Sequence, residues 1–252
     1  MAADRLTQAV RQQLGLGRLL PLGGAADGAW ITESAAVGAL RRAASAALPG
    51  VRLGTVRLAL ADPATAVPAT VPAPPSALPA GPLRLTADFA ATVDEPLPAV
   101  AGRLRAALWS AGVRTLGLDL DAVDLRATAL LDGPEAVESA EAEETPEGAA
   151  GGEVSPEDDG SAARAVRAVP GVARLAPVLG GPAQAVRIRD RTDEEPGRHT
   201  QVQIAVTESR CALDVTAAVR AAVAVATSDG APGPVTVAVV VTAVDPAGRT
   251  AR

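Results

Sequence analysis

Alternating apolar and polar positions mark two segments of the chain as one-sided β-strands. The first segment covers residues 84–94 and the second covers residues 201–207. Their apolar positions are Leu85, Ala87, Phe89, Ala91 and Val93 in the first segment, and Val202, Ile204 and Val206 in the second. Because side chains two positions apart share one face of a strand, both segments predict a sheet with one buried and one solvated face.

The same segments are related by a constant offset of 115 residues, which pairs Phe89 with Ile204 and Thr92 with Thr207. The offset continues into two amphipathic helical patterns, whose apolar stripes are Val100, Leu104 and Leu108 in one and Val215, Val219 and Val223 in the other. Arg105-Ala106-Ala107 falls on Arg220-Ala221-Ala222. This self-similarity predicts an internal duplication.

Each half also has an opening helix and a closing strand. We expect helices over 31–48 and 161–169, both ended by a Pro-Gly-Val sequence, and closing strands at Leu116, Leu118 and Leu120 and at Val235 to Val241. The fold class is therefore α+β, with two tandem copies of a small helix-strand-strand-helix-strand module. Val240 and Val244 make the second face of the last strand apolar, which predicts burial between the modules or in an oligomer.

Composition places the boundaries of these modules. We expect an N-terminal arm over 1–30, a first module over 31–133 with a stiff proline-rich loop at 62–82, an acidic disordered linker over 134–160, a second module over 161–246 and a tail over 247–252. The arm contains a short amphipathic helix with Leu6, Val10 and Leu14 on its apolar face, and we expect it to pack on the first module. Alternatively, Leu16, Leu19, Leu20 and Leu22 contact a membrane or another protein.

The net charge of −6 comes from the linker, which holds ten acidic residues and leaves 23 basic against 19 acidic residues elsewhere. Scattered arginines and three aromatic residues do not provide a nucleic-acid surface. The longest aliphatic run, Val235 to Val241, is far shorter than the roughly 20 residues of a membrane helix. With no signal peptide pattern near the N-terminus, we expect a cytoplasmic protein without a membrane span of its own.

Few side chains suit catalysis, because the chain has one His, one Cys, and neither Tyr nor Lys. We therefore expect no enzymatic activity, no cofactor and no metal. His199 is interpreted as an exposed loop histidine, Cys211 as a small buried side chain at a helix start, and Trp30 and Trp109 as packing residues. Asp119, Asp121 and Asp124 are interpreted as a solvated strand face, since their spacing lacks the ligands of a calcium loop.

Both halves resemble the alkaline-shock or envelope-stress-response family of small cytosolic proteins, and the second half is the closer match. The residues that carry the resemblance are Val169-Pro170-Gly171-Val172, Val202 to Val206, Val215, Val219-Arg220 and Val235-Thr236-Val237-Ala238-Val239. A Tyr-Gly pair after the middle strand and an Asn in the closing strand, typical of that family, are absent here. The N-terminal stretch is similar to actinobacterial proteins that carry a nucleopolyhedrovirus-type family name. The resemblance implies a non-catalytic protein that self-associates and is recruited beneath the membrane, near the cell envelope, by a separate anchoring protein.

Three functions remain open from the sequence. The leading hypothesis is a cytosolic interaction or scaffold protein linked to envelope stress, which self-associates or binds a membrane-anchoring protein through exposed sheet edges. The second is a small-molecule sensor with a ligand between the modules, where Arg187, Arg189 and Arg191 meet an anion. The third is an enzyme that uses Asp119, Asp121 and His199.

Overall fold

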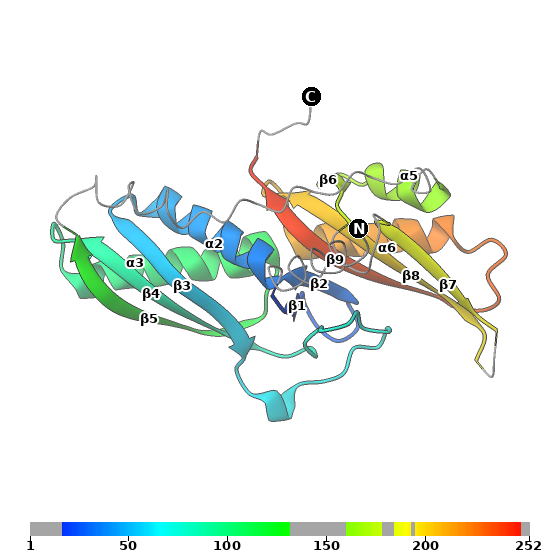
Figure 1. Ribbon diagram of the computed structural model, residues 1–252, viewed down its shortest axis with the longest axis horizontal. Coiled ribbons are helices and arrows are strands. Elements are labelled where there is room, and N and C mark those ends of the chain that lie inside the picture. The colour runs from blue at the N-terminus through cyan, green and yellow to red at the C-terminus, as the bar shows by residue number, and fades with distance from the viewer. Residues whose placement is uncertain (1–16, 132–159, 178–183, 193–194, 248–252) are drawn as a thin grey trace, which may run out of the picture.

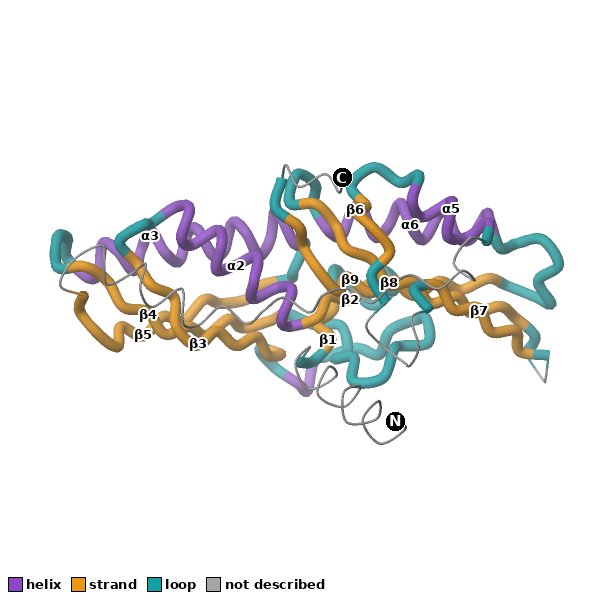
Figure 2. The backbone as a smooth tube through the Cα atoms, turned by 45° about the horizontal axis from the view of Figure 1, so that its top comes forward, coloured by secondary structure: helices purple, strands orange, loops and turns teal. Residues whose placement is uncertain are grey.

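The protein has a mixed α+β fold in which two β-sheets are covered by helices on the same side. The computed structural model describes residues 17–131, 160–177, 184–192 and 195–247. Figure 1 shows the two sheets next to each other along the long axis of the molecule. Figure 2 shows the helices along one side of both sheets and irregular loops on the opposite side.

The first sheet has three strands in the order β3-β4-β5, with β3 antiparallel to β4 and β4 parallel to β5. Its elements are α2 (Glu33–Ala47), β3 (Val51–Leu60), β4 (Leu83–Thr92), α3 (Leu97–Ser110), the π-helical turn η2 (Ala111–Leu116) and β5 (Leu120–Leu131). The predicted alternation in β4 is confirmed for four positions. Leu85, Ala87, Phe89 and Ala91 are buried in the core and face the helices. Val93 lies beyond the end of this strand and is 64% exposed, so its predicted place on the buried face is wrong.

The second sheet has six strands in the order β1-β2-β9-β8-β6, and β7 also pairs with β8. Its strands are β1 (Leu19–Pro21), β2 (Ala29–Thr32), β6 (Val172–Leu175), β7 (Val186–Arg191), β8 (Gly197–Thr207) and β9 (Val235–Asp245), and its helices are α5 (Ser161–Arg167) and α6 (Ala212–Ala226). The parallel strand β9 occupies one edge of β8, while β6 and β7 pair antiparallel with successive parts of the other edge. The sequence did not predict β7, because arginines at every second position gave residues 186–191 a loop-like composition.

The N-terminal segment forms two strands of the second sheet, which the sequence did not predict, and it also contacts the first module, since Arg18 donates to the carbonyl oxygen of Leu58 in β3 (2.8 Å). Strand β2 pairs parallel with β9, with Ile31 opposite Val241. Helix α2 begins at Glu33, two residues later than predicted, because Thr32 caps it by accepting a hydrogen bond from the backbone N–H of Ala35. Leu19, Leu20 and Leu22 are also buried within the chain, which excludes them as membrane or partner contacts.

The closing strand of the first half starts later than the sequence predicts. Leu116 ends the π-helical turn and Leu118 lies in the following loop, although both side chains are buried. Gly117 separates them with a left-handed backbone conformation (φ +79°), and a β-carbon at this position would overlap the Cβ atom of Leu213. The apolar spacing of the three leucines therefore reflects a tight turn against the second half, and only Leu120 belongs to β5.

A continuous apolar core joins the two halves, because one cluster of buried side chains includes members of α2, α3, α6 and both sheets. At the junction, Arg42 of α2 donates hydrogen bonds to Glu208 (2.7 Å) and to the carbonyl oxygen of Val244 (2.7 Å). Val240 is buried on the opposite face of the sheet, as predicted. Val244 instead joins the helix-facing core, because a β-bulge between Val241 and Ala243 shifts the alternation.

Several predicted features lie outside the described residues. These are the amphipathic helix at Leu6, Val10 and Leu14, the alternative contact of Leu16 with a membrane or another protein, most of the 134–160 linker and the tail after residue 247. Among the helices that the structure does describe, none combines the length and the hydropathy needed to cross a bilayer.

Candidate functional site

An open groove of about 1220 Å³ separates the proline-rich loop of the first half from the β7–β8 hairpin of the second half. The loop contributes residues 68–73 and 77–79. The opposite wall consists of residues 189–192 and 195–199, with Pro234 and Thr236 at the start of β9. The groove is therefore built jointly by both halves, and its volume is sufficient for a drug-sized ligand.

The loop wall is held against the outer face of the second sheet by one buried valine. Val71 is 8% exposed and packs with Trp30, Ala238 and Val240. Gly28 allows this approach, since a β-carbon there would lie 2.7 Å from a methyl carbon of Val71. The prediction of a surface loop is thus confirmed, with the addition that the loop covers part of the second sheet (cyan in Figure 1).

Backbone hydrogen bonds fix the course of this loop. Val67 and Ala80 exchange two of them, and Leu78 donates one to the carbonyl oxygen of Leu19. The indole N–H of Trp30 donates to the carbonyl oxygen of Leu78 (3.4 Å). Residues 68–79 contain no charged side chain, so the loop forms an uncharged wall rich in proline and alanine.

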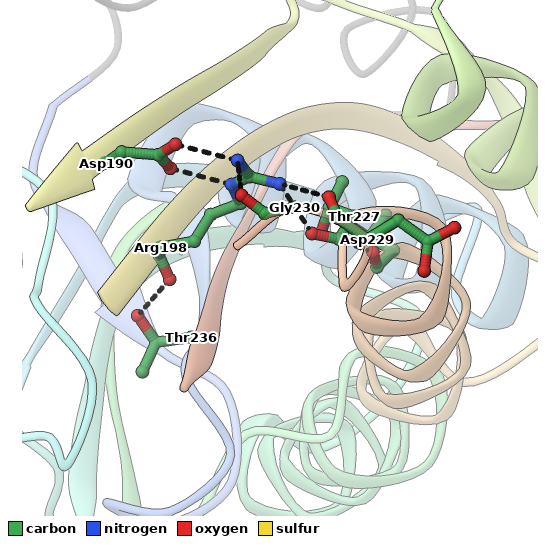
Figure 3. A network of polar contacts seen from close by, with 7 residues as sticks. Asp190, Arg198, Thr227, Asp229, Gly230 and Thr236 are labelled. Carbon is green, nitrogen blue, oxygen red and sulfur yellow. Dashed lines mark hydrogen bonds and ion pairs between the residues drawn. The ribbon is translucent and has the colours of Figure 1, made fainter. Parts of the chain in front are cut away.

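The hairpin wall carries most of the charge, and two ion pairs neutralise part of it. Arg198 donates to both carboxylate oxygens of Asp190 (2.7 Å each), and its guanidinium also binds the carbonyl oxygens of Thr227, Asp229 and Gly230 (Figure 3). Hydrogen bonding from Arg198 lowers the pKa of the Asp190 carboxyl group. Arg198 therefore fastens β7 and the α6–β9 loop to the end of β8.

Three polar side chains form a row across the face of the sheet that looks toward the loop. Arg189 in β7 is directly opposite His199 in β8, and His199 is directly opposite Thr236 in β9. Directly opposed residues project from the same face with Cβ atoms roughly 5 Å apart in an antiparallel pair. We call Arg189, His199 and Thr236 the polar row. Ala238, two residues beyond Thr236, contacts the same cluster as Val71, which places the row beside the loop.

His199 is a half-buried strand residue, so its interpretation as an exposed loop histidine is wrong. Its Nδ1 atom lies 3.0 Å from the hydroxyl oxygen of Thr236, and that hydroxyl group donates to the carbonyl oxygen of Arg198 (3.3 Å). Because the single hydroxyl proton is used in this way, we assign the proton of the neutral ring to Nδ1 and the lone pair to Nε2. Burial lowers the pKa of His199, and the positive charge of Arg189 lowers it further.

Arg189 is the cation of this wall whose charge is not compensated. Its side chain is exposed and makes no ion pair or hydrogen bond within the described part of the chain. Arg191 lies 3.7 Å from Glu195, and Arg187 also has an interaction partner. Of the three arginines predicted to meet an anion, Arg189 and Arg191 line the groove, and Arg189 is the one available to a ligand.

The other candidate residues lie away from the groove. Asp121 and Asp124 are about half exposed and pair with Arg84 of β4, at 3.7 Å and 2.9 Å, and Asp119 directly precedes β5 on the same sheet. This agrees with the prediction of a solvated strand face. The structure therefore does not unite these carboxylates with His199, which lies on the second sheet.

Among the described residues, no three His, Cys, Asp or Glu side chains lie close enough together to hold a metal ion. Cys211 is half-buried at the N-cap of α6, so it is less buried than predicted. Trp30 is confirmed as a packing residue at 2% exposed, whereas Trp109 is 40% exposed.

Comparison with known proteins gives no match: no family model, no curated protein and no solved structure is similar to this chain. The groove is therefore interpreted from its own chemistry. Its carboxylates are engaged in ion pairs with arginines, and its histidine is bonded to a threonine instead of a carboxylate. Such an arrangement suits recognition of a negatively charged group more than proton transfer between paired acid and base residues.

Proposed function

We propose that the protein is a non-catalytic binding protein built from two copies of one α+β module, and that the groove between them is its recognition site. The observation that carries this proposal is that both halves supply walls to the groove and that Arg189 lines it without an ion-pair or hydrogen-bond partner among the described residues. A groove with mostly apolar walls and a few placed polar groups is the usual form of a ligand site.

Irregularities of the two sheets support the duplication. The β4–β5 ladder has a bulge between Phe89 and Ala90, and the β8–β9 ladder has one between Ile204 and Ala205, which are 115 residues further along. β-Bulges tend to be kept within families. In each ladder the hydroxyl group of the bulged threonine lies near a carbonyl oxygen of the paired strand: Thr128 donates to Phe89 (3.2 Å), and the Thr242 hydroxyl lies 3.4 Å from the carbonyl oxygen of Ile204 while its shorter bond goes to Ala176 (2.9 Å).

A second shared detail links the helices to the sheets. Arg105 of α3 donates to the carbonyl oxygen of Val123 (3.0 Å), and Arg220 of α6 donates to that of Val237 (3.2 Å). These two arginines are again 115 residues apart. Val123 and Val237 occupy matching ladder positions, opposite Leu85 and Thr200. A shared origin accounts for the same helix-to-strand contact in both halves.

The resemblance to envelope-stress-response proteins gives the binding function a cellular setting. We propose a cytosolic interaction or scaffold protein that self-associates or is recruited to the inner face of the membrane by an anchoring protein. A small-molecule sensor is the second candidate, and the position of Arg189 in a groove between the two halves favours it. In both cases the groove is the site that contacts the partner or ligand.

A site-specific photo-crosslinking experiment in the native host tests this proposal. A photoreactive amino acid replaces Ala73 in the groove wall, and the matched control replaces Ala59, which is exposed on the outer face of the first sheet. We expect crosslinked species at Ala73 alone, lost with Arg189→Gln and kept with Arg57→Gln, an exposed strand arginine of the first sheet.

The cellular fractions of this experiment separate the candidates. A small protein crosslinked in the membrane fraction supports the scaffold, while a crosslinked copy of the chain itself supports self-association. A metabolite screen by thermal shift covers the sensor, since a ligand at a hundredfold excess over its Kd adds about 2.7 kcal/mol of stability. Equal crosslinking at Ala73 and Ala59, with no stabilising metabolite, contradicts the groove as a recognition site.

A further inference from the structure

We infer that the groove binds a small organic anion, whose carboxylate or phosphate group lies between Arg189 and His199 and whose apolar body lies along the proline-rich loop. This inference rests on the proposed role of the groove and adds the chemical class of its ligand. It follows from three features: the uncompensated charge of Arg189, the orientation of the His199 ring and the absence of charged side chains from residues 68–79.

Among the described residues that line the groove, the charge balance leaves Arg189 as the one positive centre. Asp190 is bound by Arg198, and Glu195 lies beside Arg191. The facing loop supplies no carboxylate to Arg189. A guanidinium group binds carboxylate or phosphate oxygens through two parallel N–H donors, so an oxyanion is the ligand group that this position suits best.

His199 couples the binding of an anion in this site to protonation of its ring. Since Nδ1–H donates to Thr236, the neutral ring presents a lone pair at Nε2, which repels an oxyanion. Protonation at Nε2 turns the same atom into a donor, so anion binding and proton uptake favour one another. Among the described residues, the charged groups that line the groove with the ring are Arg189, Arg191, Glu195 and the ion-paired Asp190 and Arg198, while the loop and Thr236 contribute none.

The loop wall determines the rest of the ligand. Ala69, Ala73 and Leu78, with three prolines, line the groove opposite the polar row. A carboxylate with an aliphatic chain buries that chain against this wall, whereas acetate reaches only the polar row. The expected gain is about fourfold in affinity for each methylene group that becomes buried.

The chain contains a single histidine, so NMR provides a direct test with sodium hexanoate, acetate and inorganic phosphate as probes. The ring proton of His199 is followed through a pH titration with and without each probe. We expect the pKa of His199 to rise on binding and hexanoate to bind more tightly than acetate. Calorimetry should show that hexanoate binds more weakly as the pH rises from about 6 to 8, where hexanoate itself is almost fully ionised throughout.

Three variants complete the test. Arg189→Gln should weaken hexanoate at least about tenfold, and Arg57→Gln should leave the affinity unchanged. His199→Gln should remove the pH dependence measured by calorimetry. Arg189 is exposed on an edge strand, so its replacement should not affect folding, which far-ultraviolet circular dichroism verifies.

Two results would overturn the inference. One is a His199 signal that does not respond to any probe, and the other is an equal response in the wild-type protein and Arg189→Gln. If crosslinking at Ala73 still depends on the groove in that case, the anion is wrong while the proposed function stands. If the probes bind as expected but the groove captures no partner, the sensor function is favoured over the scaffold.

Discussion

Replacing Val71 with alanine should release the proline-rich loop from the second sheet. Val71 is the loop residue whose side chain is most deeply inserted against Trp30, Ala238 and Val240, and it is 8% exposed. Val67, in the same loop, is 54% exposed and forms two backbone hydrogen bonds with Ala80. The two valines therefore provide the same chemical change in a buried and in an exposed environment.

The magnitude follows from the methyl groups that are lost. Val→Ala removes two of them, and at about 0.8 kcal/mol for each buried carbon group the cost at position 71 is about 1.5 kcal/mol, with any remaining cavity adding to it. The same change at Val67 should cost less than about 0.5 kcal/mol. A difference of 1.4 kcal/mol corresponds to about tenfold in an equilibrium constant, so loop opening should become about ten times more frequent in Val71→Ala.

Hydrogen exchange of the Trp30 indole N–H measures this opening directly, because that group donates to Leu78 in the loop. We expect its exchange to accelerate about tenfold in Val71→Ala and to remain unchanged in Val67→Ala. Urea denaturation followed by circular dichroism reports the global stability of both variants. Equal exchange rates in the two variants would refute the reasoning, since they would mean that Val71 does not hold the loop.

Three further predictions concern the junction and the histidine. Gly117→Ala should destabilise the protein by at least about 2 kcal/mol in urea denaturation, because Gly117 has a left-handed backbone and an added β-carbon would overlap Leu213. The control Gly102→Ala, in the open middle of α3, should stabilise the protein by about 0.5–1 kcal/mol. Arg42→Gln should cost about 1 kcal/mol in the same assay by removing the hydrogen bonds between the halves, and an unchanged midpoint would argue against this role. Folding lowers the pKa of His199, so the unfolded chain binds more protons than the folded protein. The free energy of unfolding should therefore fall as the pH drops below about 6.5 toward the folded-state pKa. Denaturation curves of His199→Gln should lack this part of the pH dependence.

Periodicity was sufficient to predict the elements that bury one face. The strand around Phe89, the helices that carry Leu104 and Val219, and the valines of β9 lie where their patterns predict. Hydrophobic periodicity did not predict a strand that is buried on both faces or a turn whose side chains are buried. Strand β2 is buried along its whole length, so it has no alternation, and the spacing of Leu116 and Leu118 imitates a strand although they flank a turn.

The candidate site was predicted only in part, because it depends on contacts between distant segments. Arg189 was considered for an anion, but sequence alone did not indicate that the proline-rich loop forms the facing wall. His199 was assigned to a loop because the acidic residues before it resemble a surface turn. Thr236, directly opposite on the neighbouring strand, is the partner that fixes its ring, and only the register of β8 and β9 brings the two residues together.

The difference between the two halves explains how the groove between them forms. In the first half, the segment between β3 and β4 is long enough to leave its own sheet and cover the outer face of the other, with Val71 as its anchor. In the second half, β7 returns to β8 through a short charged hairpin. An uncharged wall from one half thus meets a charged wall from the other. Neither half alone contains both walls, so recognition in the groove requires the two halves to remain packed on their common core.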